Sequence, residues 1–478
     1  MLVREIPAEE VDWVNNSFVD PNGRVFEWRG GIYRALEPAY LVRWRQLVDD
    51  GTIPALLRDG LLIESELTDL QVASGNAVLC HRRVPVVSYC FEWLPKMLKE
   101  AALLTLDLCI RLAEKKLTLQ DGHPWNILFD GTRPIYVDAG SIVPARDDIL
   151  WAPYQQFCNF FLFPLYLYAT GRDHVARCLL RDYLYGVTDN DLLATLSFSY
   201  KLRHPRRVLG VALPSWLGNL IEHLPEEMKV RLLSILRRAG GEAKNHRLKI
   251  KFFESVQNDI AALGFPRTKS HWARYYGTPD HSWFRTDLVP GDWQRKQETV
   301  TGILTDLRPK SVLDVGANTG HYAKIAAVQG ARVTACELDV AALTVCYEQA
   351  RKDRLNILPL VTNVLSTSPA AGRGAVALSP AIERLRSDLV MGLAVVHHMV
   401  AAERIRIKRL TEIFAAVTNR WLLLEFVPPL HPKIGASPVP GLDDFTAGDL
   451  QDSLKTNFAS VRSFASYPHD RQLFVCEK

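Results

Sequence analysis

The sequence of 478 residues lacks an apolar run long enough to cross a membrane, since its most apolar stretch, Phe160–Ala169, is far shorter than the roughly 18 residues required. Its first residues carry acidic side chains and no apolar core, so we expect no secretion signal. The eight cysteines include no CxxC pair, which argues against a zinc ribbon. Several of them lie inside apolar runs, which indicates buried thiols in a reducing compartment, and we therefore expect a cytoplasmic protein.

An excess of one charge is also missing, because 57 lysines and arginines face 53 aspartates and glutamates, for a net charge of +4. Proteins that neutralise many phosphates usually carry a stronger or more clustered excess, so no nucleic-acid partner is expected. The hydrophobic share of 48% is enough to bury a core, which excludes disorder as the main state. The length predicts two or three domains, and no pattern specifies an oligomeric state.

Changes in residue pattern divide the chain into four regions. The first mixes helix and strand signals, with a hairpin around Gly30-Gly31, strands over Leu61–Leu67 and Val84–Phe91, and a helix over Lys99–Lys116. The second is helical, and Gly264-Phe-Pro266 ends it because proline cannot continue a helix. The predicted boundaries are 1–150 for an α+β region, 151–265 for a helical segment packing on it, 266–297 for an aromatic connector and 298–478 for the last domain.

The last region alternates strand and helix signals, which predicts an α/β fold with βαβ units and a parallel sheet covered by helices on both faces. The expected strands are Ser311–Val315, Arg332–Cys336, Ile357–Val361, Asp388–Val396 and Trp421–Val427, followed by a terminal hairpin over Val461–Tyr467 and Gln472–Cys476. The expected helices are His321–Val328, Val340–Lys352 and Ala401–Val417.

One tight turn carries the strongest signal for a ligand. In Ser311-Val-Leu-Asp-Val-Gly-Ala-Asn-Thr-Gly320 a strand runs into a turn, where Gly316 and Gly320 allow close approach to the backbone. Glu337 ends the next expected strand, where a carboxylate can accept both hydroxyls of a ribose. The order Asp314-x-Gly316-x-x-x-Gly320 departs from the GxGxxG of dinucleotide folds and fits the variant that binds S-adenosylmethionine (SAM) better. The alternative is a βα turn that holds no ligand.

This segment resembles motif I of class I SAM-dependent methyltransferases. The resemblance continues through Ile357–Asn363, Leu393–His398 and Leu424–Pro429, and it narrows to a bacterial group related to the nodulation protein NoeA. It implies a Rossmann-like sheet, SAM as the cofactor and an acceptor that the resemblance does not identify. The positions that it assigns to the cofactor are Asp314, Gly316, Asn318 and Gly320 in the turn, Glu337 for the ribose with Asp339 as the alternative, and Asn363 for the adenine.

Candidate catalytic residues follow the later strands. Methyl transfer needs an oriented acceptor and, for a hydroxyl or ammonium acceptor, a base. His397 and His398 are expected to end the fourth strand at the carboxyl edge of the sheet, where at most one of two adjacent residues faces the cofactor. Glu425 ends the fifth strand in the same rim, although each of these side chains could instead hold loops together. With His431 they match no ordered metal motif, so no metal is expected.

A second motif lies in the first region, where Asp121 is followed by Asn126 and then by Asp138. This spacing resembles the catalytic loop and metal-binding aspartate of protein kinases and aminoglycoside-type phosphotransferases, in which the first Asp receives the hydroxyl proton and the other two residues hold magnesium. No lysine precedes Lys96, so the usual phosphate-pairing lysine is missing, and arginine is not equivalent in geometry. We expect the three side chains to converge in a kinase-like fold that transfers no phosphate. The alternative is a loop held together by hydrogen bonds.

Three functions follow from these patterns. The favoured one is a SAM-dependent methyltransferase of biosynthesis that acts on a small-molecule acceptor, with roughly the first 300 residues shaping acceptor binding and the connector Trp272–Trp283 forming a wall of the cleft. A bifunctional kinase-methyltransferase and a SAM-binding sensor or scaffold without turnover are the alternatives. The missing lysine argues against the former, and the histidine pair argues against the latter.

Overall fold

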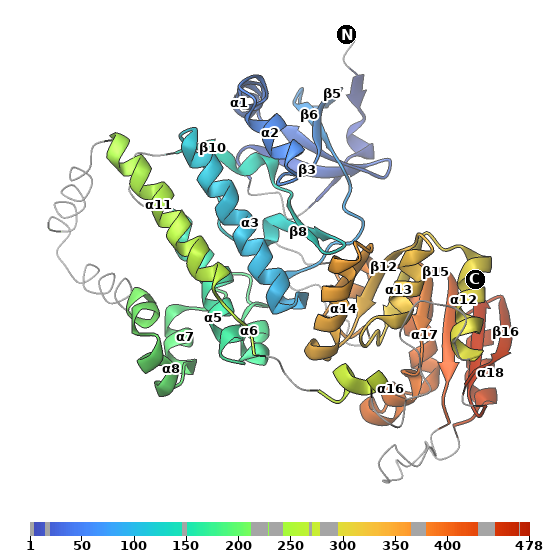
Figure 1. Cartoon of the computed structure of the whole chain (residues 1–478). Helices are drawn as coiled ribbons and strands as arrows, with labels where there is room; N and C mark the ends of the chain where they lie inside the picture. The colour runs from blue at the N-terminus through green and yellow to red at the C-terminus, as the bar shows by residue number, and fades with distance from the viewer. Residues whose placement is uncertain are drawn as a thin grey trace. The chain divides into compact units, whose positions relative to one another are not determined.

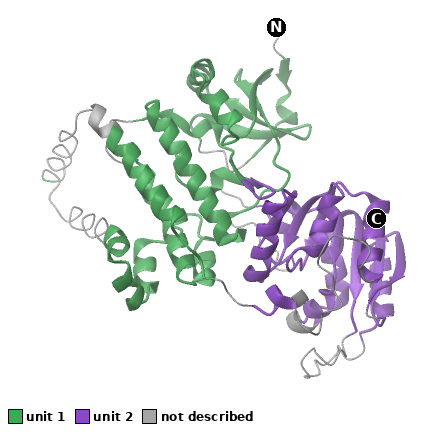
Figure 2. Cartoon of the chain, in the orientation of Figure 1, with its two compact units in different colours: residues 1–128, 134–266, 372–377 green, residues 129–133, 267–371, 378–478 purple. Residues whose placement is uncertain are grey.

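The computed structural model describes residues 4–14, 20–145, 151–211, 228, 242–266, 270–277, 295–364, 379–428, 445–467 and 469–478. The chain forms two compact units, which we call the N-terminal unit (residues 1–128, 134–266 and 372–377) and the C-terminal unit (residues 129–133, 267–371 and 378–478) (Figure 2). No helix in the described part of the chain is long and apolar enough to cross a membrane. The finer division into four regions stays a prediction.

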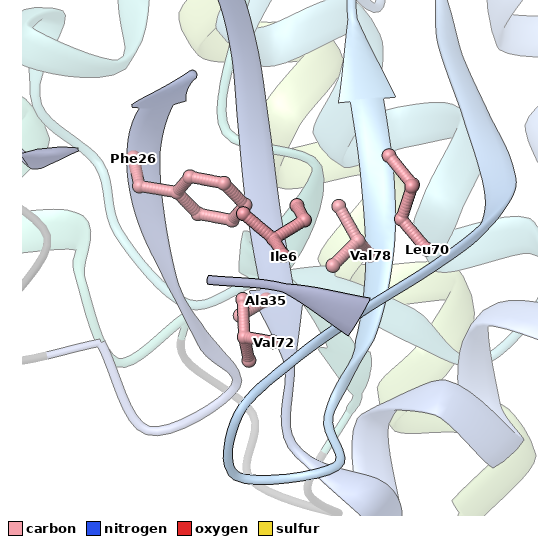
Figure 3. Packing of buried hydrophobic residues seen from close by; sticks show 6 residues of the cluster. All are labelled: Ile6, Phe26, Ala35, Leu70, Val72 and Val78. Atoms are coloured by element: carbon pink, nitrogen blue, oxygen red, sulfur yellow. The ribbon is translucent and has the colours of Figure 1, made fainter. Parts of the chain in front are cut away.

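The N-terminal unit contains a six-stranded sheet in the order β1-β5-β6-β4-β3-β2, in which only β1 runs parallel to its neighbour. Its strands are β1 (Arg4–Ile6), β2 (Asp12–Trp13), β3 (Gly23–Trp28), β4 (Gly31–Leu36), β5 (Ser65–Val72) and β6 (Ala77–His81). Arg29 and Gly30 join β3 to β4 with φ angles of 46° and 78°, as a two-residue hairpin turn requires. Six apolar side chains from β1 and β3–β6 form a buried cluster on this sheet, namely Ile6, Phe26, Ala35, Leu70, Val72 and Val78 (Figure 3).

Helices make up most of the rest of the N-terminal unit. They are α1 (Pro38–Asp49), α2 (Thr52–Arg58), α3 (Pro95–Glu114), α4 (Tyr154–Phe157), a π-helical turn (Cys158–Leu162), α5 (Phe163–Ala169), α6 (Asp173–Leu179), α7 (Asp189–Thr195), α8 (Phe198–Arg203) and α11 (Glu242–Ala261). The long helices α3 and α11 pack side by side (Figure 1). Lys99 of α3 fixes their contact, because its Nζ donates to the carbonyls of Ala261 and Leu263 at the end of α11.

Two short strand pairs lie beside or within the segment that carries Asp121, Asn126 and Asp138, which we call the kinase-like loop. β7 (Leu117–Leu119) pairs with β10 (Ile142–Pro144), and β8 (Ile127–Asp130) pairs with β9 (Arg133–Tyr136). Two sequence predictions nearby are wrong. Val84–Phe91 forms no strand, because Pro85 cannot donate to a ladder, and β6 precedes it. The predicted strand Leu61–Leu67 begins later, at Ser65.

The C-terminal unit contains a seven-stranded sheet in the order β13-β12-β11-β14-β15-β17-β16. Its strands are β11 (Ser311–Val315), β12 (Arg332–Cys336), β13 (Ile357–Leu360), β14 (Ser387–Gly392), β15 (Thr418–Phe426), β16 (Ser460–Ala465) and β17 (Gln472–Glu477). β11–β15 are parallel, and β17 is antiparallel to both of its neighbours. The parallel strands follow the 3-2-1-4-5 order of doubly wound folds, which confirms the predicted fold class and puts the switch point between β11 and β14.

The helices of this unit are η7 (Trp272–Gly277), α12 (Arg295–Leu307), α13 (His321–Val328), α14 (Val340–Lys352), α15 (Ala381–Arg384), α16 (Val396–Glu403), α17 (Ile407–Val417) and α18 (Ala447–Lys455). β11, β12, α13 and α14 have the predicted bounds. The fourth strand does not, because it ends at Gly392 and the positive φ of Ala394 (54°) turns the chain into α16. The predicted helix Ala401–Val417 is accordingly two helices, α16 and α17.

Candidate functional site

The glycine-rich turn after β11 has the backbone conformation that its sequence predicts. Gly316 and Gly320 have φ angles of 74° and 79°, and Gly320 caps the start of α13. The amides of Gly316 and Ala317 both donate to the carbonyl of Cys336, which ties the turn to the end of β12. A Cβ atom at Gly316 would lie 2.9 Å from Val395 Cγ2, so a side chain here would push the turn away from the β14–α16 loop. The glycine therefore brings two carboxyl ends of the sheet together.

Asn318 completes the turn in a left-handed conformation of its own, with a φ angle of 52°. Its side-chain Oδ1 accepts a hydrogen bond from the amide of Thr319 at 2.6 Å, and its own amide donates to Glu337 Oε2 at 3.0 Å. Asparagine tolerates this conformation better than most residues, so it can replace a glycine here.

Glu337 follows β12 and holds the turn through its carboxylate. Besides Asn318, the amides of Leu338 and Asp339 donate to Glu337 Oε1 at 2.7 and 2.9 Å. A carboxylate offers about four acceptor positions, so Oε2 keeps room for about one further donor. The alternative ribose ligand, Asp339, is occupied differently, because its Oδ1 caps α14 at Ala342 N (2.8 Å) and accepts from Ser270 Oγ (2.9 Å). Each of the two residues therefore has one oxygen that can accept a further hydrogen bond, Oε2 in Glu337 and Oδ2 in Asp339.

Asp314 is buried at the carboxyl end of β11, with 3% of its surface exposed. Burial raises its pKa to about 7, and the negative charge of Glu337 acts in the same direction. The backbone amide of Ala323 and the Lys296 ammonium oppose this shift without cancelling it. Asp314 is thus a carboxylate at the switch point that a bound cation would stabilise in its ionised form.

The structure corrects the placement of His397 and His398. They do not end a strand but lie in the first turn of α16, so the expectation that they point to opposite faces of a sheet is wrong. Their ring centroids are 4.0 Å apart. His398 is half-buried, which lowers its pKa, and the ring of Trp272 packs perpendicular to it at 5.3 Å. The connector residue Trp272 therefore lies beside the helix that leaves the switch point.

Other parts of the predicted connector and site fall partly outside the described residues. Residues 278–294, His431 and the side chain of Tyr276 lie outside the described part of the chain. Asn363 is described and half-buried in the loop after β13, at the same edge of the sheet. Among the described residues, no three His, Cys, Asp or Glu side chains are grouped to hold a metal ion.

Glu425 of β15 is fully buried and forms an ion pair with Lys296 of α12, with 2.5 Å between Oε2 and Nζ. Its other oxygen accepts from Ser466 Oγ at 2.8 Å and lies 4.0 Å from Arg471 Nη1. Burial lowers the pKa of Lys296, while Glu425 opposes that shift. These partners satisfy the charge and the hydrogen bonds of the Glu425 carboxylate without a substrate. A catalytic role for Glu425 stays a prediction.

Three buried polar residues near this site were missed from the sequence, namely Lys296, Gln297 and His321. Gln297 Nε2 and His321 Nε2 are 3.0 Å apart, so α12 and the start of α13 are joined inside the unit. A signal did exist, because Lys296 and Gln297 continue the apolar stripe of Val300 and Leu304 at helical spacing. Polar residues in such a stripe are buried and need partners.

The kinase-like residues of the N-terminal unit do come together. Asn126 Nδ2 lies 3.3 Å from Asp138 Oδ2, and Asp121 Oδ1 lies 4.0 Å from His123 Nε2. Burial lowers the pKa of His123, and Asp121 and Asp138 are both close enough to oppose that shift. A cation that the sequence did not reveal also reaches this site, since Arg34 Nη2 donates to Asp138 Oδ1 at 2.7 Å. The roles of these residues remain proposals.

Known proteins resemble this chain over most or part of its length. The chain is 28% identical over 428 residues to nodulation protein NoeA of Rhizobium meliloti (strain 1021), which covers 87% of this chain and 85% of that protein. The chain is thus similar to NoeA over most of the length of both proteins. A match of this extent includes parts of both units. No family model matches the chain.

Solved structures give weaker likenesses. The bifunctional kinase-methyltransferase WbdD is 21% identical, with a TM-score of 0.30 over 41% of this chain and 43% of that one. Magnesium protoporphyrin IX methyltransferase (ChlM) from Synechocystis PCC 6803, with bound SAH, is 17% identical, with a TM-score of 0.31 over 48% of this chain and 96% of that one. The chain thus spans less than half of the WbdD chain. Likenesses with TM-scores this low assign no role to any residue of this chain.

Proposed function

We propose that the chain is a SAM-dependent methyltransferase that acts on a small-molecule acceptor. The observation that carries this proposal is the meeting of a buried carboxylate, Asp314, with a glycine-rich turn and a second carboxylate, Glu337, at the switch point of a doubly wound sheet. SAM is a cationic nucleoside, so it presents both a positive charge and ribose hydroxyls. When bound, it supplies a methyl group from its sulfonium.

The donor set fits this cofactor. Asp314 is the acceptor for a cation, because within the described part of the chain the Ala323 amide and the Lys296 ammonium do not offset its burial. Glu337 Oε2 is the acceptor for a ribose hydroxyl, since its other oxygen is saturated by two backbone amides. Asn363 reaches the same edge by its position after β13. The turn itself is fixed by Gly316 and Asn318, so these oxygens are oriented before any ligand arrives.

The acceptor side of the site is proposed to include His398 and Trp272. Burial lowers the pKa of His398, which keeps its imidazole neutral near pH 7 and able to accept a proton from a hydroxyl or ammonium acceptor. Trp272 packs on that imidazole and supports the prediction that the connector forms a wall of the cleft. We also propose that the N-terminal unit helps to select the acceptor, as a small α/β domain needs no such addition to bind SAM.

Calorimetric titration with SAM and with its demethylated product tests cofactor binding. Glu337→Ala should weaken binding by at least about tenfold, because it loses a charge-assisted hydrogen bond of about 1.5–3 kcal/mol. Asp339→Asn is the matched control, since asparagine keeps the cap on α14 while removing the neighbouring charge. Equal affinity of wild type and Glu337→Ala removes Glu337 from the site, and loss in Asp339→Asn alone moves the ribose to Asp339.

Turnover separates an enzyme from a SAM-binding scaffold. The wild type should form demethylated SAM when a small-molecule cell extract is added as the acceptor source. His398→Ala should abolish this turnover and leave SAM affinity unchanged, because the proposed role of His398 concerns the acceptor. Tight SAM binding with no turnover in any extract would favour the scaffold.

A further inference from the structure

The kinase-like loop of the N-terminal unit contains a buried cation of its own. Arg34 lies on β4 with 4% of its surface exposed, and its guanidinium forms ion pairs with Asp138 and Asp20. Burial works against this charge, but the two carboxylates outweigh burial and raise the pKa of Arg34. Burial also raises the pKa of Asp20, while Arg34 opposes that shift. One guanidinium therefore pairs with two carboxylates that would otherwise repel each other more strongly.

Three hydrogen bonds from the protein engage the oxygens of Asp138, and Oδ2 keeps room for about one further partner. Oδ1 accepts from Arg34 Nη2 at 2.7 Å and from the Gly140 amide at 3.1 Å, and Oδ2 accepts from Asn126 Nδ2 at 3.3 Å. A Cβ atom at Gly140 would collide with the guanidinium of Arg34, so the absence of a side chain at this position lets Arg34 approach the backbone. In phosphotransferases, the corresponding Asn and Asp hold magnesium. Here a divalent ion would meet a positive charge already bonded to its ligand.

The same guanidinium joins the sheet to the loop. Asp20 precedes β3, and Asn22 beside it donates from Nδ2 to the carbonyl of Gly140 at 2.8 Å and to Gln120 Oε1 at 3.2 Å. The side chains of Asp20 and Asn22 are thus bonded to the guanidinium and to both ends of the segment of residues 120–140, all within one unit.

We propose that Arg34 replaces the divalent cation of the kinase-like loop, so that Asp138 and Asn126 hold no metal in the folded chain. A guanidinium is a fixed, planar cation that pairs with carboxylates through several N–H groups, and it stays protonated at every physiological pH. The residues that resemble a magnesium site then form a structural link between β4, the β2–β3 connection and the loop. This proposal is independent of the methyltransferase proposal, since all of its residues lie in the N-terminal unit.

Titration of the full chain with Mn²⁺, read by electron paramagnetic resonance with and without ATP, tests the proposal. Wild type and Asp138→Asn should bind Mn²⁺ equally poorly. Arg34→Met should bind at least about tenfold more Mn²⁺ than wild type at the same free concentration, because two carboxylates lose their internal cation. The double variant Arg34→Met/Asp138→Asn should lose that gain. Arg207→Met, which breaks another Arg–Asp pair of this unit, should behave as wild type.

Two results would overturn the proposal. One is Mn²⁺ binding by wild type that Asp138→Asn abolishes, and this comparison decides the matter even if Arg34→Met fails to fold. The other is a folded Arg34→Met chain, verified by circular dichroism, that gains no Mn²⁺. ATP consumption provides a second readout, since wild type and Asp138→Ala should be equally inactive, and a robust wild-type rate lost in Asp138→Ala would show an active kinase.

Discussion

Asp314→Asn should remove a pH dependence of SAM binding that the wild type shows below neutral pH. Asp314 has a pKa of about 7 because it is buried and lies near Glu337. Binding of a cation beside it favours the ionised form, so each SAM molecule that binds below pH 7 must displace a proton. The sign is fixed: wild-type affinity rises with pH up to about 7 and then levels off.

The size of the effect follows from the shift. Each pH unit below the pKa costs about 1.4 kcal/mol, or tenfold in affinity, until the pKa of the bound state is reached. Between about pH 7.5 and 5.5 the wild type should therefore lose about 30-fold in affinity. Asp314→Asn cannot ionise, so its affinity should be flat over this range. It should be about 10- to 100-fold weaker than wild type at pH 7.5 and should approach the wild type at pH 5.5.

Isothermal titration in buffers with different heats of protonation measures both quantities. At about pH 6.5 the wild type should release most of one proton per SAM bound, and Asp314→Asn should release none. Three other groups act on Asp314, namely Glu337, the Lys296 ammonium and the Ala323 amide, and all three remain in the variant. A flat wild-type profile, or an equal slope in Asp314→Asn, would refute the assignment of the proton to Asp314.

Two further variants test the packing beneath the site by denaturant unfolding. Lys296→Met should destabilise the C-terminal unit by about 3–5 kcal/mol, because it leaves Glu425 buried without its main partner. The double variant Lys296→Met/Glu425→Leu should recover most of that stability. If it recovers none, the broken ion pair is not the cause of the loss. Gly320→Ala should lower the free energy of unfolding more than Gly330→Ala does. Both glycines have a positive φ, but only a Cβ at Gly320 would collide with Cys346. Equal losses of stability in the two variants would rule out the collision.

The core of the C-terminal unit could be predicted because its signals are local. β11 is a buried apolar strand that ends at a glycine turn, and α14 starts at the cap Asp339, so both sets of bounds follow from neighbouring residues. The order of the parallel strands then fixes which turns meet at the switch point. Asp314, Gly316 and Glu337 were placed together from the sequence for that reason.

The histidine pair shows where local signals fail. The apolar run Leu389–Val396 has no period that separates a strand from a buried helix, so the predicted strand continued through it. The chain turns at Ala394, whose φ of 54° is unusual for a residue with a side chain. The neighbouring residues in the sequence do not predict this conformation. His397 and His398 consequently belong to a helix.

Ion pairs between distant residues could not be predicted at all. Arg34 and Asp138 are separated by 104 positions, and Lys296 and Glu425 by 129, so no spacing rule connects them. Both are decided by tertiary packing, which places a buried charge where another must neutralise it. The kinase-like spacing predicted that Asn126 and Asp138 lie close together, whereas the sequence could not reveal which cation Asp138 faces.

This contrast between the two units leads to a last prediction about Asp314. Asp138 has the Arg34 guanidinium at 2.7 Å, whereas the ammonium that could serve Asp314 belongs to Lys296, which pairs at 2.5 Å with Glu425. Glu425→Gln leaves Lys296 without that partner and should direct its charge toward Asp314, whose pKa should fall.

The midpoint of the pH profile for SAM binding should then shift to lower pH by about one unit relative to wild type, because one unit corresponds to only about 1.4 kcal/mol of added attraction. Ser466→Ala is the matched control, since it removes a hydrogen bond from Glu425 but leaves the ion pair with Lys296 intact, and its midpoint should not move. If the midpoint in Glu425→Gln stays in place or rises, Lys296 has lost its proton rather than turned to Asp314. In that case the charge of Lys296 depends on Glu425, and Lys296 cannot serve as the cation that stabilises ionised Asp314.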